Sequence, residues 1–412
     1  MDITDYFQLQ ILLVRKDRIM KKRIVALLLC AAVIGSMAGC GKESDTNGTE
    51  ITSEASHVKS GDIDIDYAKQ VSKLAEYKGI EVTLPTSYEV TDEACNNFLT
   101  SLLTNMSLDA YKEVKDKKTV GKNDIVKADY TGYVDDKKFD GGEATDQYID
   151  VAGNSAADGG TGFIEGFTDA LKGAKVGETV KGNVKFPDNY GSEDLAGKDA
   201  VFEFKIHSVV EPVTFDDIDD AYVEKNFKEQ LNITTVKDLK AAVQSQLESN
   251  AYSQTATQAK TYMLENSTVE VPDDYLQARL DEYVESFEKE KTTDTQTVDE
   301  YYESIGQTRD SAIASMKESL ESQIKLEFIF GYIADKEKVE MDEDDYSQFE
   351  QYVLSSNSST FTDANAMYEY YGNGDAKQGE DYLKSQYLCN KAIDYVVKNA
   401  KVTFDDGEAA ED

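Results

Sequence analysis

The stretch VKADYTGYVDDKKFDGG, residues 126–142, brings Tyr130, Phe139 and Asp140 within a few positions of one another. None of these three side chains is a strong nucleophile in its ordinary state. The chain has only 2 histidines, too few for a zinc cluster or a histidine-based triad. The residue types therefore disfavour metal and nucleophilic chemistry. They are typical either of an ordinary aromatic core or of an apolar pocket that binds its ligand without covalent chemistry.

The surrounding residues predict a small α+β domain over residues 120–211. Every second residue from Val126 to Val134 is apolar or small, which is typical of a half-buried strand. The same alternation returns later in the domain, at Phe202, Phe204 and Ile206. Between the two lies a single helical signal, with apolar residues spaced along one face and a glycine at the C-cap: Phe163, Ile164, Phe167, Ala170, Leu171 and Gly173. We expect an antiparallel sheet covered by one short helix.

The rest of the chain predicts a linker segment before this domain and an all-α region after it. Residues 63–119 contain a strand-like piece at 79–84 and a helix that opens near Thr91. Residues 212–412 carry apolar stripes at helical spacing, the first of them directly behind Thr235 in the position of an N-cap. The expected architecture is therefore a small β domain attached to a helical domain.

The first forty residues predict export. Met20 is followed by a basic cluster, a short apolar run and small residues that end at a cysteine, which is the pattern of a secretory signal. That cysteine, Cys40, resembles the lipidated residue of a bacterial lipobox, although Met37 stands where leucine is usual. We expect a signal region over 1–39 with its true start at Met20, a lipid on Cys40 and a flexible tether over 40–62. The alternative is an uncleaved signal-anchor, which would also place the remaining chain outside the cytoplasm.

Composition narrows the classes of partner. The formal net charge is −37 at pH 7, which disfavours nucleic acid because phosphate contacts require clustered Lys and Arg. Such acidity is typical of a solvated, non-adhesive surface. Beyond the signal region and Cys40 only Cys95 and Cys389 remain, so neither a disulfide framework nor a metal site is expected. Sequence alone leaves open whether these two cysteines pair.

The stretch at 126–142 resembles the opening of an FKBP-type peptidyl-prolyl isomerase domain, where Tyr-Thr-Gly, a short turn and Phe-Asp follow one another. The similarity continues through GFIEGFTDALKGAKVGE (162–178), FPDNYG (186–191) and GKDAVFEFKIHSVVE (197–211). Several motifs in the same order and spacing make the resemblance specific. It implies cis-trans isomerisation of X-Pro peptide bonds in an apolar pocket, with no cofactor and no metal.

The resemblance also implies which residues form the site. Matching motif by motif gives the catalytic residues Tyr130, Phe139, Asp140 and Tyr190. It gives the residues that hold the substrate as Tyr148, Phe163, Ile164, Phe167 and Phe202.

The segments on either side resemble trigger factor. YKGIEVTLP and VTDEACNNFLTSL are similar to the family's linker into the isomerase domain. LENSTVEVPDDYLQARLDEYVESF and YLCNKAIDYVVKNAKVT are similar to its C-terminal chaperone domain. The likeness covers about residues 75–403 and lacks the family's ribosome-binding N-terminal domain. It implies unfolded or partly folded secreted polypeptides as partners, with no ribosome and no nucleic acid.

Two functional hypotheses follow. The first is a foldase anchored by its lipid to the extracytoplasmic face of the cell membrane, with an isomerase pocket beside helical arms that hold unfolded chains. The second is a holdase chaperone, or a surface binding scaffold, whose isomerase domain is weak or inactive. Three departures from the family keep the second hypothesis open: Phe167 replaces a common tryptophan, Glu165 replaces a proline frequent in trigger factors, and the loop 154–162 is longer than usual.

Overall fold

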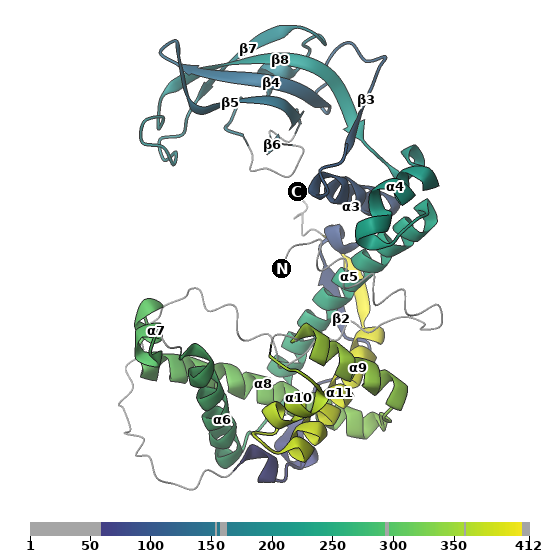
Figure 1. Ribbon diagram of the computed structural model, residues 1–412, viewed down its shortest axis with the longest axis vertical. Helices are drawn as coiled ribbons and strands as arrows, with labels where there is room; N and C mark the ends of the chain where they lie inside the picture. The colour runs from purple at the N-terminus through teal and green to yellow at the C-terminus, as the bar shows by residue number, and fades with distance from the viewer. Residues whose placement is uncertain (1–58, 153–154, 157–162, 293–295, 358–359, 406–412) are drawn as a thin grey trace, which may run out of the picture. The chain divides into compact units, whose positions relative to one another are not determined.

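The computed structural model describes residues 59–152, 155–156, 163–292, 296–357 and 360–405 (Figure 1). The predicted signal region, Cys40 and the predicted tether up to residue 58 lie outside these ranges. The chain forms two compact units. We call Glu89–Glu248 the sheet unit, and we call the described residues up to Tyr88 together with those from Ser249 onward the helical unit. The domain bounds predicted from the sequence stay a prediction.

The sheet unit is built on an antiparallel sheet with strand order β3-β8-β4-β5-β6, and β7 also pairs with β8. The strands are β3 (Tyr111–Glu113), β4 (Ile125–Val134), β5 (Lys137–Asp150), β6 (Ser155–Ala156), β7 (Thr179–Lys185) and β8 (Asp199–Pro212). The predicted alternation in β4 is confirmed, because Val126, Ala128 and Gly132 are buried while Lys127 and Asp129 are not. Phe202, Phe204 and Ile206 likewise face the core from β8.

The predicted helix over 163–171 is much shorter than the apolar spacing indicates. Only Asp169–Leu171 is helical, as a single 3-10 turn, and the residues before it form turns. Gly166 explains the difference, because its φ of 81° is left-handed and interrupts a right-handed helix. Gly173, with φ 80°, ends the segment as the sequence predicts.

Three helices complete the sheet unit: α3 (Asp92–Asn105), α4 (Asp220–Leu231) and the first half of α5 (Val236–Asn266). The predicted helix start near Thr91 and the predicted cap at Thr235 are confirmed, since the Thr91 and Thr235 hydroxyls accept hydrogen bonds from the N–H groups of Ala94 and Asp238 at 3.0 and 3.1 Å. These helices share one buried apolar cluster with β3 and the end of β8.

The helical unit joins the segment that precedes the sheet unit to the segment that follows it. Its helices are α2 (Tyr67–Gln70), the second half of α5, α6 (Asp273–Lys291), α7 (Val298–Ser304), α8 (Arg309–Glu337), α9 (Glu343–Ser356), α10 (Ala364–Tyr371) and α11 (Ala376–Lys398). Two small sheets tie the segments together. β1 (Val71–Lys73) pairs with β9 (Thr268–Val269), and β2 (Glu81–Leu84) runs parallel to β10 (Lys401–Phe404).

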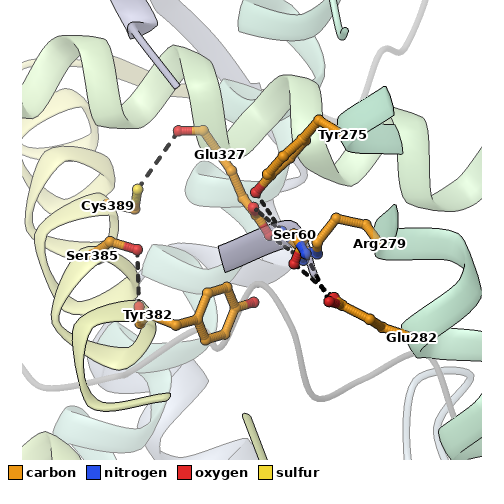
Figure 2. A network of polar contacts seen from close by, with 8 residues as sticks. All are labelled: Ser60, Tyr275, Arg279, Glu282, Glu327, Tyr382, Ser385 and Cys389. Carbon is orange, nitrogen blue, oxygen red and sulfur yellow. Dashed lines mark hydrogen bonds and ion pairs between the residues drawn. The ribbon is translucent and has the colours of Figure 1, made fainter. Parts of the chain in front are cut away.

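The first described residues already contact the helical unit. The backbone N–H and the hydroxyl of Ser60 donate to the Glu282 carboxylate at 2.8 and 2.6 Å, as Figure 2 shows. Asp62 accepts a hydrogen bond from Gln378 on α11 at 2.8 Å. None of the helices within the described ranges is long and apolar enough to cross a membrane. Cys95 and Cys389 are both buried, and no disulfide joins them.

A buried ion pair lies at the centre of the helical unit (Figure 2). Arg279 on α6 donates to both carboxylate oxygens of Glu327 on α8, at 3.0 and 3.4 Å, and Glu327 is only 5% exposed. The guanidinium also lies over the rings of Tyr275 and Tyr382, at 5.7 and 5.4 Å. Burial by itself lowers the pKa of Arg279, but the nearby Glu327 carboxylate outweighs it, so the pKa is raised and the guanidinium keeps its charge.

Candidate active site

One connected set of aromatic rings lies at the centre of the sheet unit. We call it the ring cluster; its members are Tyr130, Phe139, Phe163, Phe167, Phe186, Tyr190, Phe202 and Phe204. They come from β4, β5, the turns before the 3-10 helix, the β7–β8 loop and β8. Segments distant in sequence therefore converge on a single apolar site.

Phe167 is the centre of the ring cluster and is 2% exposed. Phe163 stacks on its face at a centroid distance of 4.1 Å with planes 12° apart. Tyr130, Phe202 and Phe204 meet it edge-on at 5.3, 4.8 and 4.9 Å. Edge-to-face and offset contacts of this kind add stability beyond the burial of ring area. Phe167 is therefore enclosed by other aromatic rings in the core of the sheet.

Phe139 lies against two glycines. A Cβ on Gly132 would come within 2.7 Å of both the Phe139 and the Phe202 rings, and a Cβ on Gly142 would come within 2.6 Å of Phe139. The glycine of the Tyr-Thr-Gly motif is therefore required by close packing, because any side chain there would displace both rings. The Phe139 ring therefore packs directly against the backbone of these two glycines.

Tyr190 presents its polar end to solvent. Its side chain is 39% exposed, and among the described residues its hydroxyl has no hydrogen-bond partner. Asp140 is exposed on β5, and its carboxylate accepts no hydrogen bond from the described part of the chain. No charged side chain is buried anywhere in the described part of the sheet unit. The site therefore combines a buried aromatic cluster with the exposed Tyr190 side chain, which contacts the cluster through Phe186, and with the exposed Asp140, which follows Phe139 on β5.

The structure does not bring Tyr148 to the ring cluster. Its ring lies 4.4 Å from that of Tyr111 and packs against the apolar cluster of α3 and α4. Its neighbour Ile149 faces the ring-cluster core, so alternation turns Tyr148 to the opposite side of β5. An extra residue on β5 contributes, because Ala128 pairs with Gln147 whereas Tyr130 pairs with Ala144. Such a bulge changes which face later side chains occupy.

The other predicted site residues, apart from the exposed Asp140, are brought together. Tyr130, Phe139, Phe163, Phe167, Tyr190 and Phe202 belong to the ring cluster, and Ile164 packs partly buried against the same core. The predicted set lacks Phe186 and Phe204. Both had a period-two signal in the sequence, since Phe186 follows Val184 and Phe204 follows Phe202 on inward-facing positions. Most of the loop 154–162, which is longer than usual for the family, lies outside the described residues.

A separate polar group lies on the other face of the sheet. His207 Nε2 is 2.8 Å from the Asp129 carboxylate, which also accepts a hydrogen bond from the Asp146 N–H at 2.9 Å. The Asp146 bond and then His207 lower the pKa of Asp129. Ligand atoms of Asp129, Asp146 and His207 lie within 4.8 Å of one another. The Lys127 ammonium already stands 3.0 Å from the Asp146 carboxylate, however, so one of the two negative charges is compensated within the protein.

Comparison with known proteins identifies both regions. Residues 116–208 match the family described as FKBP-type peptidyl-prolyl cis-trans isomerase, and residues 235–398 match the bacterial trigger factor C-terminus. The trigger factor of Macrococcus caseolyticus is 30% identical over 336 residues, covering 80% of this chain and 72% of that protein. The chain belongs to the trigger factor family. The trigger factor of Shouchella clausii is 28% identical over 333 residues, with the same coverage of 80% and 72%.

One solved structure is also similar. It is described as "Promiscuous Substrate Recognition in Folding and Assembly Activities of the Trigger Factor Chaperone" and covers 79% of this chain and 72% of its own, at 13% identity. Its TM-score of 0.29 is too low to carry an argument about the fold. Family membership therefore rests on the sequence matches.

The present chain carries an FKBP-type peptidyl-prolyl cis-trans isomerase domain. The reaction of such a domain explains why its site needs no nucleophile. Rotation about a peptide bond is opposed by amide resonance, with a barrier of about 18–20 kcal/mol. No bond is made or broken, so a catalyst only has to favour the twisted amide over the planar one. The planar amide carries more charge on its carbonyl oxygen. A wall of aromatic rings that excludes water from this oxygen therefore favours the twist.

Proposed function

We propose that this protein is a foldase anchored to the extracytoplasmic face of the cell membrane through a lipid on Cys40. Its isomerase domain and its helical unit would act there on unfolded or partly folded secreted polypeptides. The support for the location is the basic, apolar and small-residue pattern that ends at Cys40. The support for the activity is membership of the trigger factor family together with the FKBP-type domain.

The observation that carries the catalytic part is the ring cluster with one free hydroxyl at its edge. The Phe139 ring, which is only partly buried, would contact the prolyl ring, and the buried rings of Phe202 and Phe167 would support it and keep water from that side of the imide. The Tyr190 hydroxyl, which is exposed and has no hydrogen-bond partner among the described residues, donates to a substrate carbonyl and fixes its orientation. Tyr130 would close the wall, and Asp140, which follows Phe139 on β5, would interact with the polarised amide.

Proline-limited refolding of a client protein tests this assignment. The full-length protein, Tyr190→Phe and Phe139→Ala are compared at equal concentration. Loss of one orienting hydrogen bond is expected to slow catalysis about three- to ten-fold in Tyr190→Phe. Loss of a ring from the wall is expected to do at least as much in Phe139→Ala. If all three proteins accelerate refolding equally, or none does, the pocket is not catalytic and the holdase alternative is favoured.

The location is tested separately. Cells that express the protein or Cys40→Ser are labelled with a fatty acid and fractionated. The unchanged protein is expected to carry label and to sediment with membranes, whereas Cys40→Ser is expected to carry none and to leave the membrane fraction. Equal labelling of both proteins would contradict lipidation at Cys40. Unlabelled protein that stays in the membrane fraction would instead favour the signal-anchor alternative.

A further inference from the structure

Tyr190 contacts a single neighbouring aromatic ring in the described part of the chain. Among the described aromatic side chains only Phe186 contacts it, at a centroid distance of 4.7 Å with planes 56° apart. Tyr190 lies in the loop between β7 and β8, where its N–H donates to the Pro187 carbonyl at 3.1 Å. That bond fixes the backbone and leaves the side chain free to change rotamer. A partly exposed tyrosine without a packing partner samples several rotamers.

Phe186 itself is held rigidly. It is 3% exposed and continues the inward-facing positions of Gly182 and Val184 on β7. Its N–H donates to the Lys198 carbonyl at 2.9 Å, directly beyond the last paired residues of β7 and β8. The Phe186 ring therefore belongs to the folded sheet, although the loop that carries Tyr190 begins at the next residue.

Phe186 also contacts the other edge of the site. Its ring meets that of Phe139 at 5.7 Å with planes 80° apart. Phe139 comes from β5 and Tyr190 from the β7–β8 loop, and no ring contact between the two is present in the described structure. One buried ring thus connects two side chains that approach the substrate from different elements.

We propose that Phe186 is a positioning residue of the isomerase, which holds the Tyr190 hydroxyl at a fixed place relative to the Phe139 ring. The proposal rests on the roles proposed above for Tyr190 and Phe139. Phe186 acts through them, because its own ring is buried behind both. Fixing a hydrogen-bond donor in advance lowers the barrier of the bound substrate more than it strengthens binding. Removal of the Phe186 ring is therefore expected to lower kcat and to leave KM little changed.

The experiment measures kcat and KM of the full-length protein with a proline-containing tetrapeptide. Phe186→Ala is compared with Phe227→Ala, a matched control that removes an equally buried ring from α4, outside the ring cluster. Phe186→Ala is expected to lower kcat about ten-fold with KM little changed, whereas Phe227→Ala should stay within about two-fold. Phe186→Leu fills most of the volume and keeps the fold. It is expected to lower kcat only about three-fold, which is half of the decrease in log kcat seen in Phe186→Ala. Equal effects of Phe186→Ala and Phe227→Ala would overturn the proposal.

A double-mutant cycle separates this proposal from the one on which it rests. If Phe186 acts through Tyr190, then Phe186→Ala should cost much less in a Tyr190→Phe background than in the unchanged protein. Losses that simply multiply would show that Phe186 acts elsewhere and would overturn its positioning role. If Tyr190→Phe alone has no effect, the proposed role of Tyr190 fails and the positioning proposal falls with it. If Tyr190→Phe lowers kcat but Phe186→Leu and Phe186→Ala do not, only the Phe186 proposal fails.

Discussion

The sheet unit and the helical unit bury different kinds of side chain. The ring cluster of the sheet unit is apolar, and the described part of that unit buries no charged group. The helical unit buries the Arg279–Glu327 pair and surrounds it with tyrosines (Figure 2). The ring-cluster core contains no buried charge in its described residues. The helical unit is also built on apolar clusters, but within them it needs the mutual compensation of two buried charges.

The difference matches what each unit has to do. An isomerase wall must keep water away from an amide, and a charge inside it would bring water or a counter-charge with it. The helical unit has no such constraint, and a bidentate ion pair between α6 and α8 fixes how these helices pack. Substitutions in the two cores should therefore have different effects. Loss of a partner charge should destabilise the helical unit, whereas small steric changes in the sheet unit should lower isomerase activity.

The largest effect is expected from Glu327→Ala. The variant leaves the Arg279 guanidinium buried without its partner, which typically costs about 3–5 kcal/mol of the free energy of unfolding. Unfolding of the helical unit, followed by calorimetry and by the helical circular dichroism signal, should shift strongly to lower temperature. The kcat/KM of the isomerase should stay unchanged, because Glu327 contacts no residue of the ring cluster.

Glu321→Ala is the matched control on the same helix. Glu321 pairs with Lys325 at 2.6 Å on α8, but both side chains are about one third exposed. Exposed pairs of this spacing contribute about 0.3–0.5 kcal/mol. Similar losses in Glu321→Ala and Glu327→Ala would contradict the importance of the buried pair. A drop in kcat/KM in Glu327→Ala would contradict the independence of the two cores.

A pair of glycine substitutions gives the next largest effect. A Cβ on Gly132 meets the Phe139 and Phe202 rings at 2.7 Å, and a Cβ on Gly331 of α8 meets the Tyr67 ring at 2.5 Å. Overpacking of this kind typically costs about 1–3 kcal/mol. Gly132→Ala should therefore destabilise the sheet unit and Gly331→Ala the helical unit. Only Gly132→Ala should also lower kcat/KM, about ten-fold, because it displaces a ring of the site.

Thermal unfolding and tetrapeptide kinetics on the same preparations check this pair. Gly331→Ala serves as the steric control, since it creates a comparable overlap outside the isomerase domain. If Gly132→Ala leaves kcat/KM unchanged, the exact position of the Phe139 ring is not critical for catalysis. If Gly331→Ala lowers kcat/KM as much as Gly132→Ala does, general destabilisation rather than ring placement explains both losses.

Local patterns in the sequence predicted much of this architecture. Period-two alternation identified β4 and β8, and hydroxyl residues before apolar stripes identified the starts of α3 and α5. Motif order predicted that most of the ring cluster would converge. These features depend on neighbours along the chain, so they can be seen without coordinates.

Other features depend on pairings that local patterns do not encode. The helical unit needs β1 and β2, which precede the sheet unit, to pair with β9 and β10, which follow it. The placement of Tyr148 depends on one extra residue in β5, and the short helix depends on the left-handed Gly166. The buried Arg279–Glu327 pair joins residues 48 positions apart, and nothing in their local sequence distinguishes them from surface charges.

The smallest effect, and the one that depends on pH, is expected at Glu337 on α8. Its carboxylate accepts a hydrogen bond from the Tyr77 hydroxyl at 2.6 Å and one from the Lys78 ammonium at 3.2 Å. These bonds hold the pKa of Glu337 down to about 2, from an ordinary value of 4.5. A carboxyl group with a lowered pKa stabilises the fold fully above its ordinary pKa, and this contribution disappears as the pH falls through the folded value.

The unfolding temperature of the helical unit in the unchanged protein should therefore exceed that in Glu337→Gln at neutral pH. The difference should narrow as the pH falls from 4.5 toward 2. Asp129→Asn is the counterpart in the sheet unit, because hydrogen bonds from Asp146 and His207 lower the pKa of Asp129 in the same direction. Each variant should shift only the transition of its own unit. A difference for Glu337→Gln that stays constant down to pH 2 would show that the hydrogen bonds, and not the ionisation of Glu337, stabilise the contact between α8 and the segment before the sheet unit.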